Sequence, residues 1–464
     1  MNLKIYVALL FWASILAVSC SRDDISFDTP ASSLRFSTDT VFCDTVYNQV
    51  RSESYAFKVY NDADQDVMIP NIKLGRGAAS LYRINVDGKS GTEFNNVPLR
   101  KKDSLYVFVE IAPTASGPES IAADKVFFTT GSGVENVTLF SVVQDAEFFV
   151  ETSGNPNILS GSHTWNNDKA KIIFGDLTLA TGATLNIESG TKVYFFKNSG
   201  LTVKNGATLN VNGDLNAEVV FRGDRNDPYY DTIPKNWNSM HFENGSLLNM
   251  NYARVFGGTR GLDFREASAT IKNSIIHTFE EYGIHAVNST ITASNLVMNN
   301  CQLADLGIFK GGNYDLTHCT LTNHWRPVAA PSLIAGNEWK NNQGQVELGS
   351  LNLNIKNSIL HSIAANAVVF TPVSGQTFSY LMRNCLITYD SNGAGYNITG
   401  NPAIVAPVIN ENPDFMNTLI SKMNLRVNTN SPAKNKGNIA DAATVPLDLV
   451  KISRTANPTL GAYQ

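Results

Sequence analysis

An internal repeat is the feature of this sequence that most restricts its fold. The stretch Leu177–Ile187 reads LTLATGATLNI and returns at an offset of 24 as LTVKNGATLNV at Leu201–Val211. The sequence IKNSIIH at Ile271–His277 returns as IKNSILH at Ile355–His361. Short units repeated along a chain are typical of solenoids, in which each unit buries its apolar side only against the next.

Fainter copies of the second repeat lie between and around these two. Aligning them places one residue of each copy in a single column, at successive offsets of 21, 21, 24, 39 and 27 along the sequence. Most members of this column are small, as expected at inward positions of stacked coils. They are Ala253, Ser274, Asn295, Cys319, Ser358 and Cys385.

The period is roughly 22 residues, with short apolar strands between Asn or Gly corners. This pattern predicts that the region is all-β and folds as a parallel β-helix. Its coils stack about 4.8 Å apart. The stretch from Leu177 to Ile404 leaves room for about ten coils. The alternative, a twisted sandwich, does not account for two long repeats at solenoid spacing.

Asparagine content divides the chain near residue 150. Asn occurs 8 times in residues 1–150 and 43 times in residues 151–464. Asn tolerates the left-handed backbone of tight corners, and its amide can hydrogen-bond along a stack. We therefore predict a separate module at 30–150, followed by the β-helix at 151–464.

The 30–150 module alternates apolar and polar residues in short runs, such as Tyr55–Tyr60 and Leu105–Val109, separated by polar turns. This pattern predicts a β-sandwich. Parts of it resemble an immunoglobulin-like module that is common in Bacteroidetes surface lipoproteins, and the resemblance implies a spacer or adhesion role. These parts are Phe57–Asn61, Tyr82–Gly88 and Asp103–Val109.

The segment Met1–Ser19 has the composition of a secretory signal peptide. Lys4 precedes the apolar stretch Ile5–Val18, which is too short to span about 30 Å of hydrocarbon. Small residues before Cys20 resemble a bacterial lipobox, which implies acylation of Cys20 as the membrane anchor. An ordinary cleaved signal with an incidental Cys is the alternative.

Residues 20–29 then form a tether. Its start, Ser21–Asp24, resembles the acidic export signal of Bacteroidetes lipoproteins. The resemblance implies an outer-membrane lipoprotein on the surface of a Gram-negative bacterium, and an inward-facing orientation stays open.

Residues 170–464 resemble right-handed parallel β-helix proteins secreted by Bacteroidetes. Asn236–Phe242 resembles their recurrent Trp-containing strand, and Ser431–Tyr463 resembles their closing segment, apart from Lys434 and Asn435. We expect the closing segment to protect the edge of the last coil. The larger offset of 39 indicates an enlarged coil at 326–350, and insertions of this kind often lie on a binding face.

Composition and motifs exclude several functions. With 36 basic and 41 acidic residues, the chain lacks the basic field of a nucleic-acid binder. We find no phosphate-binding loop, dinucleotide-binding fingerprint, hydrolase elbow or zinc motif. Candidate chemistry must therefore come from neighbouring coils.

One column of outward positions collects such residues. The triplets MHF, LDF and IHA, centred on His241, Asp263 and His285, align at successive offsets of 22 and 22 along the sequence. Their apolar flanks point inward, so the three central side chains stack on an outer face, followed by Gly307. Glu243 falls beside Arg265 two positions along.

Two imidazoles around a carboxylate could hold calcium or another divalent metal, or a general base. The simpler interpretation is a hydrogen-bonded ladder on a solvated face. A lyase would need a base beside charge-neutralising groups, and only Glu243, Asp263 and Arg265 could be placed in that way. No column offers the carboxylate pair that hydrolysis requires.

These observations favour a non-catalytic surface protein that binds a glycan or a protein partner along the solenoid flank. The alternative is a polysaccharide lyase or glycoside hydrolase. Surface aromatic residues could stack on sugars: Trp325, Trp339, Tyr229 and Tyr230. Four further cysteines are interpreted as buried thiols, with a Cys301–Cys319 bond left open: Cys43, Cys301, Cys319 and Cys385.

Overall fold

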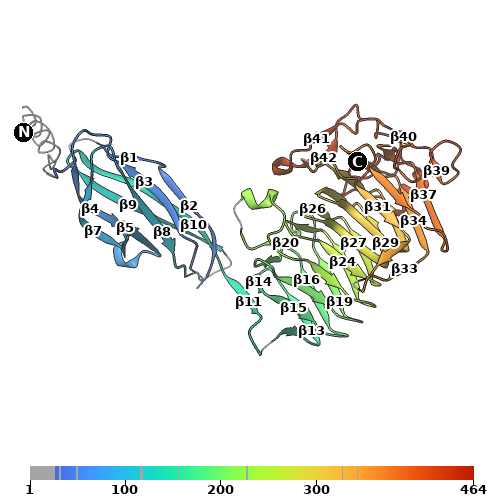
Figure 1. Cartoon of the computed structure of the whole chain (residues 1–464), viewed down its shortest axis with the longest axis horizontal. Coiled ribbons are helices and arrows are strands. Elements are labelled where there is room, and N and C mark those ends of the chain that lie inside the picture. The colour runs from blue at the N-terminus through green and yellow to red at the C-terminus, as the bar shows by residue number, and fades with distance from the viewer. Residues whose placement is uncertain are drawn as a thin grey trace, which may run out of the picture. The chain divides into compact units, whose positions relative to one another are not determined.

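The computed structural model describes residues 27–30, 33–48, 51–114, 119–154, 156–225, 228–326, 328–341 and 343–464 (Figure 1). Its contacts divide the chain into two compact units between Val143 and Gln144. The signal peptide, Cys20 and the tether up to residue 26 lie outside the described residues. Within the described part, no helix is long and apolar enough to cross a membrane.

The N-terminal unit is an all-β sandwich of two five-stranded sheets that share one core. Alternate side chains point inward, and Phe57, Val107 and Phe128 are each at most 2% exposed. One sheet has the order β1 (Arg35–Phe36), β3 (Tyr55–Tyr60), β8 (Ser104–Ile111), β5 (Tyr82–Val86) and β6 (Lys89–Gly91). The other has the order β2 (Thr40–Tyr47), β10 (Gly133–Gln144), β9 (Glu119–Thr130), β4 (Val67–Leu74) and β7 (Glu93–Leu99).

The C-terminal unit is a right-handed parallel β-helix, as predicted, with three stacks of parallel strands (Figure 1). The first stack has eleven strands, so the solenoid has eleven coils against the predicted ten or so. They are β11 (Ala146–Val150), β14 (Ala170–Phe174), β17 (Lys192–Phe195), β20 (Val219–Gly223), β23 (Ala253–Phe256), β26 (Ile275–Phe279), β28 (Val297–Cys301), β30 (Thr320–Asn323), β35 (Ile359–Ser362), β38 (Leu386–Ile387) and β40 (Val408–Ile409). Because β11 pairs with β14, the solenoid begins a few residues before position 150.

The second and third stacks alternate along the chain and are joined through the long strands β27 (Tyr282–Ser294) and β29 (Ala304–Thr317), whose first and second halves belong to successive stacks. The other strands of the second stack are β12 (Asn157–Leu159), β15 (Asp176–Leu179), β18 (Gly200–Val203), β21 (Met240–Phe242), β24 (Leu262–Arg265), β31 (Leu333–Gly336) and β36 (Val368–Thr371). Those of the third are β13 (Ser162–Trp165), β16 (Thr184–Glu188), β19 (Thr208–Asn212), β22 (Leu247–Asn251), β25 (Ser268–Lys272), β34 (Leu351–Lys356), β37 (Phe378–Arg383) and β39 (Ile404–Val405).

The inward column of small residues is confirmed with one correction. Its members follow the corner between the third and first stacks and are almost completely buried. Asn295, however, has a φ of 50° and lies at the corner itself, and Leu296 takes the inward place. Asn273 and Asn357 hold the same corner in other coils, at φ values of 48° and 49°. The faint repeat was misaligned by one residue because Asn suits the corner and resembles the small polar inward residues.

The Asn surplus has the predicted structural role. Of the 22 described non-glycine residues with positive φ, eleven are Asn. Side-chain amides also bond from coil to coil: Asn295 donates to Asn273, and Asn273 donates to Asn251, both at 2.8 Å. Corner geometry and amide ladders therefore explain the change in composition at the domain boundary.

The C-terminal segment packs against the first stack, up to Val408 of the last coil. Its hydrogen bonds and ion pairs fall on several coils, at the corner between the third and first stacks. These ties are Arg383 with Asp441, Asn357 with Asn438, Asn295 with Leu447 and Asp214 with Lys451. A cluster of aromatic rings also packs on the core toward this end of the solenoid: Phe370, Phe378, Tyr380, Tyr389 and Tyr396.

Asp305, in β29, is a carboxyl group buried inside the solenoid with 0% exposure. Among the described residues neither of its oxygens has a hydrogen-bond partner of ordinary geometry. Burial raises its pKa well above the usual value, although Cys301 opposes the shift. The equivalent residue of the next coil is Ser332, whose hydroxyl donates to the carbonyl of Ala367 at 2.9 Å.

This burial predicts a stability that falls as pH rises. The folded state keeps the Asp305 proton above pH 4, where the unfolded chain has lost it, so stability drops by about 1.4 kcal/mol per pH unit until the folded pKa is reached. Asp305→Ser should remove this slope. Unfolding by urea between pH 5 and 8 measures it, with the exposed Glu338→Gln as control, and an unchanged slope in Asp305→Ser would refute the prediction.

Candidate functional site

The predicted column of outward residues is confirmed by the strand register. His241 on β21 pairs with Asp263 on β24, and Asp263 pairs with His285 on β27. Gly307 on β29 follows, as expected. The flanking apolar residues point into the core, where Phe242 and Phe264 stack with ring centroids 4.7 Å apart.

Asp263 is the centre of the cluster because four side chains donate to its carboxylate. Nδ1 of His285 lies 2.8 Å from Oδ1, and Nδ1 of His241 lies 3.0 Å from Oδ2. Arg260 Nη1 reaches Oδ2 at 3.3 Å, and Arg265 Nε lies 3.3 Å from Oδ1. Arg260 also donates to Glu281 from two of its nitrogens.

The expectation of a solvated face is wrong for two members of the column. Asp263 is 5% exposed and His285 is 2% exposed, whereas the side chain of His241 keeps 32% of its surface. The cover over His285 consists of Tyr282, Phe309 and Trp339, with ring centroids 5.0 to 5.4 Å from its imidazole. Gly307 leaves space for the Tyr282 ring, because a Cβ at position 307 would lie 2.8 Å from that ring.

Trp339 reaches the column from the enlarged coil. The extra residues form a hairpin of β32 (Glu338–Lys340) and β33 (Val346–Leu348) between the second and third stacks. Lys310 fixes the hairpin by ion pairs to Glu347 at 2.7 Å and to Glu266 at 2.9 Å. The guanidinium of Arg265 lies 4.8 Å from the Trp339 ring centroid. The insertion therefore completes the cluster.

The electrostatics of the cluster keep Asp263 ionised. Burial opposes its charge, but hydrogen bonds from His241 and His285 and the charge of Arg265 outweigh it and hold its pKa far below the usual value. Burial lowers the pKa of His285 against the pull of Asp263. Burial also opposes the charge of Arg260, yet Asp263 and Glu281 raise its pKa.

Glu243 does not join this cluster. Its carboxylate pairs with Lys204 at 2.6 Å. Of the three residues considered for a lyase, Asp263 and Arg265 form an ion pair.

The structure does not favour the proposed metal ligands. One nitrogen of each imidazole, Nδ1, is hydrogen-bonded to an oxygen of Asp263, whereas ligands of a bound metal converge on one point at about 2.0–2.2 Å. Across the described ranges, no group of three or more His, Cys, Asp or Glu side chains is suited to hold a metal ion.

Sequence reasoning missed Arg260, Glu281 and Tyr282, which lie outside the aligned triplets. The pairing of Trp339 with Arg265 was also missed, because the two are far apart in the sequence. Trp325 is half-buried and Tyr229 is 65% exposed. All four described cysteines are free and buried, and burial raises the pKa of Cys43, Cys319 and Cys385 to about 12.

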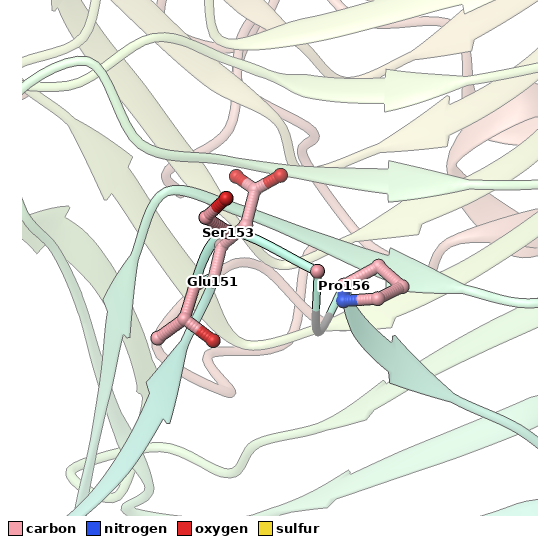
Figure 2. Close-up of a pocket in the computed structure, with 5 residues that line it drawn as sticks. Glu151, Ser153 and Pro156 are labelled. Atoms are coloured by element: carbon pink, nitrogen blue, oxygen red, sulfur yellow. The ribbon is translucent and has the colours of Figure 1, made fainter.

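A hollow of about 410 Å³ lies at the N-terminal end of the solenoid, along the connection between β11 and β12. Figure 2 shows Glu151, Ser153 and Pro156 lining it, with Thr152 and Gly154. Burial, followed by the charge of Glu151, raises the pKa of the neighbouring Asp176. All five lining residues belong to one short connection on the first coil, whereas the Asp263 cluster spans the fourth to sixth coils.

Comparison with known proteins supports the fold. Residues 260–428 match a family model described as the right handed beta helix region. No curated protein matches the chain.

Three solved structures with weak similarity are the Vibrio cholerae VesB protease, the Agl-KA catalytic domain and the catalytic domain of a GH87 alpha-1,3-glucanase in complex with tetrasaccharides. Their identities are 12%, 10% and 13%, with TM-scores of 0.17, 0.25 and 0.21. They cover 24%, 71% and 76% of this chain, and this chain covers 31%, 79% and 89% of them. Thus the chain spans about a third of the first structure, and these likenesses carry no argument about activity.

Proposed function

We propose that this chain is a cell-envelope lipoprotein whose solenoid binds a glycan without cleaving it, at the second-stack face around Arg265 and Trp339. The observation that carries this proposal is the pairing of Asp263 with four donors. A carboxylate with so low a pKa is a poor general acid or base at neutral pH. Its role is to orient Arg265 and His241.

The hairpin supports binding at this face. Trp339 is half-buried, and its indole is held between Arg265, His285 and Phe309. A fixed, partly exposed indole supplies a large amphipathic contact at little entropic cost. The same arrangement suits a protein partner, which is the second arm of this proposal.

The N-terminal part completes the proposal. The sandwich is an immunoglobulin-like spacer, and acylated Cys20 anchors the chain in the outer membrane at the cell surface. Protease treatment of intact cells should remove the solenoid from wild type. Cys20→Ala should release the protein from the membrane fraction, and a solenoid that is protected in intact cells would place it on the periplasmic side.

Truncation of Trp339 is the direct test of binding. Trp339→Ala should weaken affinity for any glycan that the purified protein binds by about tenfold or more, because a central aromatic contact is lost. Tyr229→Ala, an exposed aromatic on another loop, is the control. Glycan arrays and isothermal titration measure binding. Formation of unsaturated products or new reducing ends from a polysaccharide panel would instead support the lyase or hydrolase alternative.

A further inference from the structure

The side chain of Arg265 is held in place by its neighbours, but not all of its hydrogen-bond donors are paired with them. Its Nε and Nη2 atoms lie 3.3 and 3.5 Å from the carboxylate of Asp263, and its plane packs near the indole of Trp339. Among the described residues, its other terminal nitrogen, Nη1, has no hydrogen-bond partner. The side chain keeps 30% of its surface exposed. A fixed guanidinium of this kind has lost most of its rotamer freedom before any ligand arrives.

His241 presents an acceptor beside this donor. An ionised carboxylate only accepts hydrogen bonds, so a His241 imidazole that carries one proton carries it on Nδ1, facing Asp263. Nε2 is then an acceptor, and it has no partner in the part of the chain that the structure describes. His241 and Arg265 both approach Oδ2 of Asp263, so the two side chains are neighbours.

Arg265 has no carboxylate to itself within the cluster. Asp263 is shared among two guanidiniums and two imidazoles. The nearby carboxylates of Glu281 and Glu243 are paired with Arg260 and Lys204. A planar anion is therefore the ligand group that the open edge of Arg265 suits best, since a guanidinium matches a carboxylate with two parallel hydrogen bonds.

We infer that this face recognises the carboxylate of an acidic sugar through Arg265, while a neighbouring hydroxyl of the same glycan donates to Nε2 of His241. This inference rests on the proposed glycan-binding function and names the ligand class. Trp339 supplies the apolar contact beside the charged one. The ligand is an acidic polysaccharide that is bound and not cleaved.

The test measures binding of the full mature chain to oligosaccharides of hyaluronan, polygalacturonate and alginate by isothermal titration. Each is paired with its carboxyl-reduced form, in which the uronate has become a neutral sugar of the same linkage. At least one acidic form should bind about 10- to 100-fold more tightly than its reduced form, as expected for the loss of a charge-assisted hydrogen bond. Arg265→Lys should lose most of this preference, because it keeps the charge but not the planar fork.

Arg254→Gln, which removes an exposed Arg from the first stack, should leave the preference unchanged. Tryptophan fluorescence confirms that each variant is folded. Equal binding of acidic and reduced forms, with loss of both in Trp339→Ala, would overturn this inference and leave the proposed function standing. Binding to no glycan at all, neutral or acidic, would overturn both.

Discussion

Replacing Asp263 with alanine is expected to destabilise the solenoid by about 3–5 kcal/mol, the cost of removing one partner from a buried ionic cluster. The substitution leaves Arg260 and Arg265 without their shared carboxylate and removes the hydrogen-bond partner of Nδ1 in His285. Intrinsic tryptophan fluorescence during urea unfolding measures the effect on the solenoid alone, since the sandwich at 30–150 contains no Trp.

Asp315→Ala is the matched control. Asp315 pairs with Lys356 at 2.9 Å on the third stack, and its side chain is 40% exposed. Its removal should therefore cost no more than about 1 kcal/mol. Equal losses in the two variants would show that the buried cluster has no special role in stability.

Asp263 should also make the solenoid sensitive to acid. Its folded pKa is far below the unfolded value, so its stabilisation is complete above about pH 4 and is lost as the pH falls toward the folded pKa. Asp263→Asn should therefore lose stability at pH 7 and change less between pH 4 and 2.5 than wild type. A parallel acid dependence in wild type and variant would contradict this explanation.

Arg454→Ala is expected to loosen the C-terminal segment from the solenoid and to cost about 3 kcal/mol. Arg454 is 1% exposed and donates to Oδ1 of Asn295 at 3.0 Å and to the carbonyls of Gly461 and Ala462 at 3.2 Å. Removing it leaves the buried Oδ1 of Asn295 without this donor, at about 1–3 kcal/mol if water cannot reach it. The two carbonyl groups lose one hydrogen bond each but keep another partner.

Limited proteolysis with mass spectrometry tests whether Arg454 holds the C-terminal segment on the solenoid. In Arg454→Ala, cleavage within residues 431–464 should become faster while the coils stay resistant. Arg426→Ala serves as control, because Arg426 is exposed and its guanidinium packs over the ring of Tyr463. Resistance equal to wild type would show that the other ties hold the segment without Arg454.

The sequence predicted the solenoid well because its repeat has a direct physical cause. Each coil repeats the same inward positions and the same corner, and the period places His241, Asp263 and His285 in register. Asn295 was misplaced in the column by one residue. Asn suits both the corner, where it lies, and the small inward position that the alignment gave it. The acylation of Cys20 and the surface location stay predictions, since they fall on residues outside the described part.

The candidate site was predictable only in part. Strand register gave the column, but it could not give the cover over His285 or the extra donors to Asp263. Those depend on corners and on a hairpin, where the chain leaves the repeat. Likewise, the resemblance of the C-terminal segment to a closing segment could not predict its path. That path follows from contacts at the outer corner, such as the ion pair of Arg383 with Asp441.

By itself, the sequence determined the two-domain division, the β-helix and the stacking of its outward column, because these follow from a period that every coil must obey. Only the tertiary structure decided that Asp263 and His285 are buried and that Arg265 is held beside Trp339. Such contacts join residues dozens of positions apart through insertions that have no period. The physical reason is that stacking is a nearest-neighbour property, whereas the cover over the column depends on where non-repeating segments fold back.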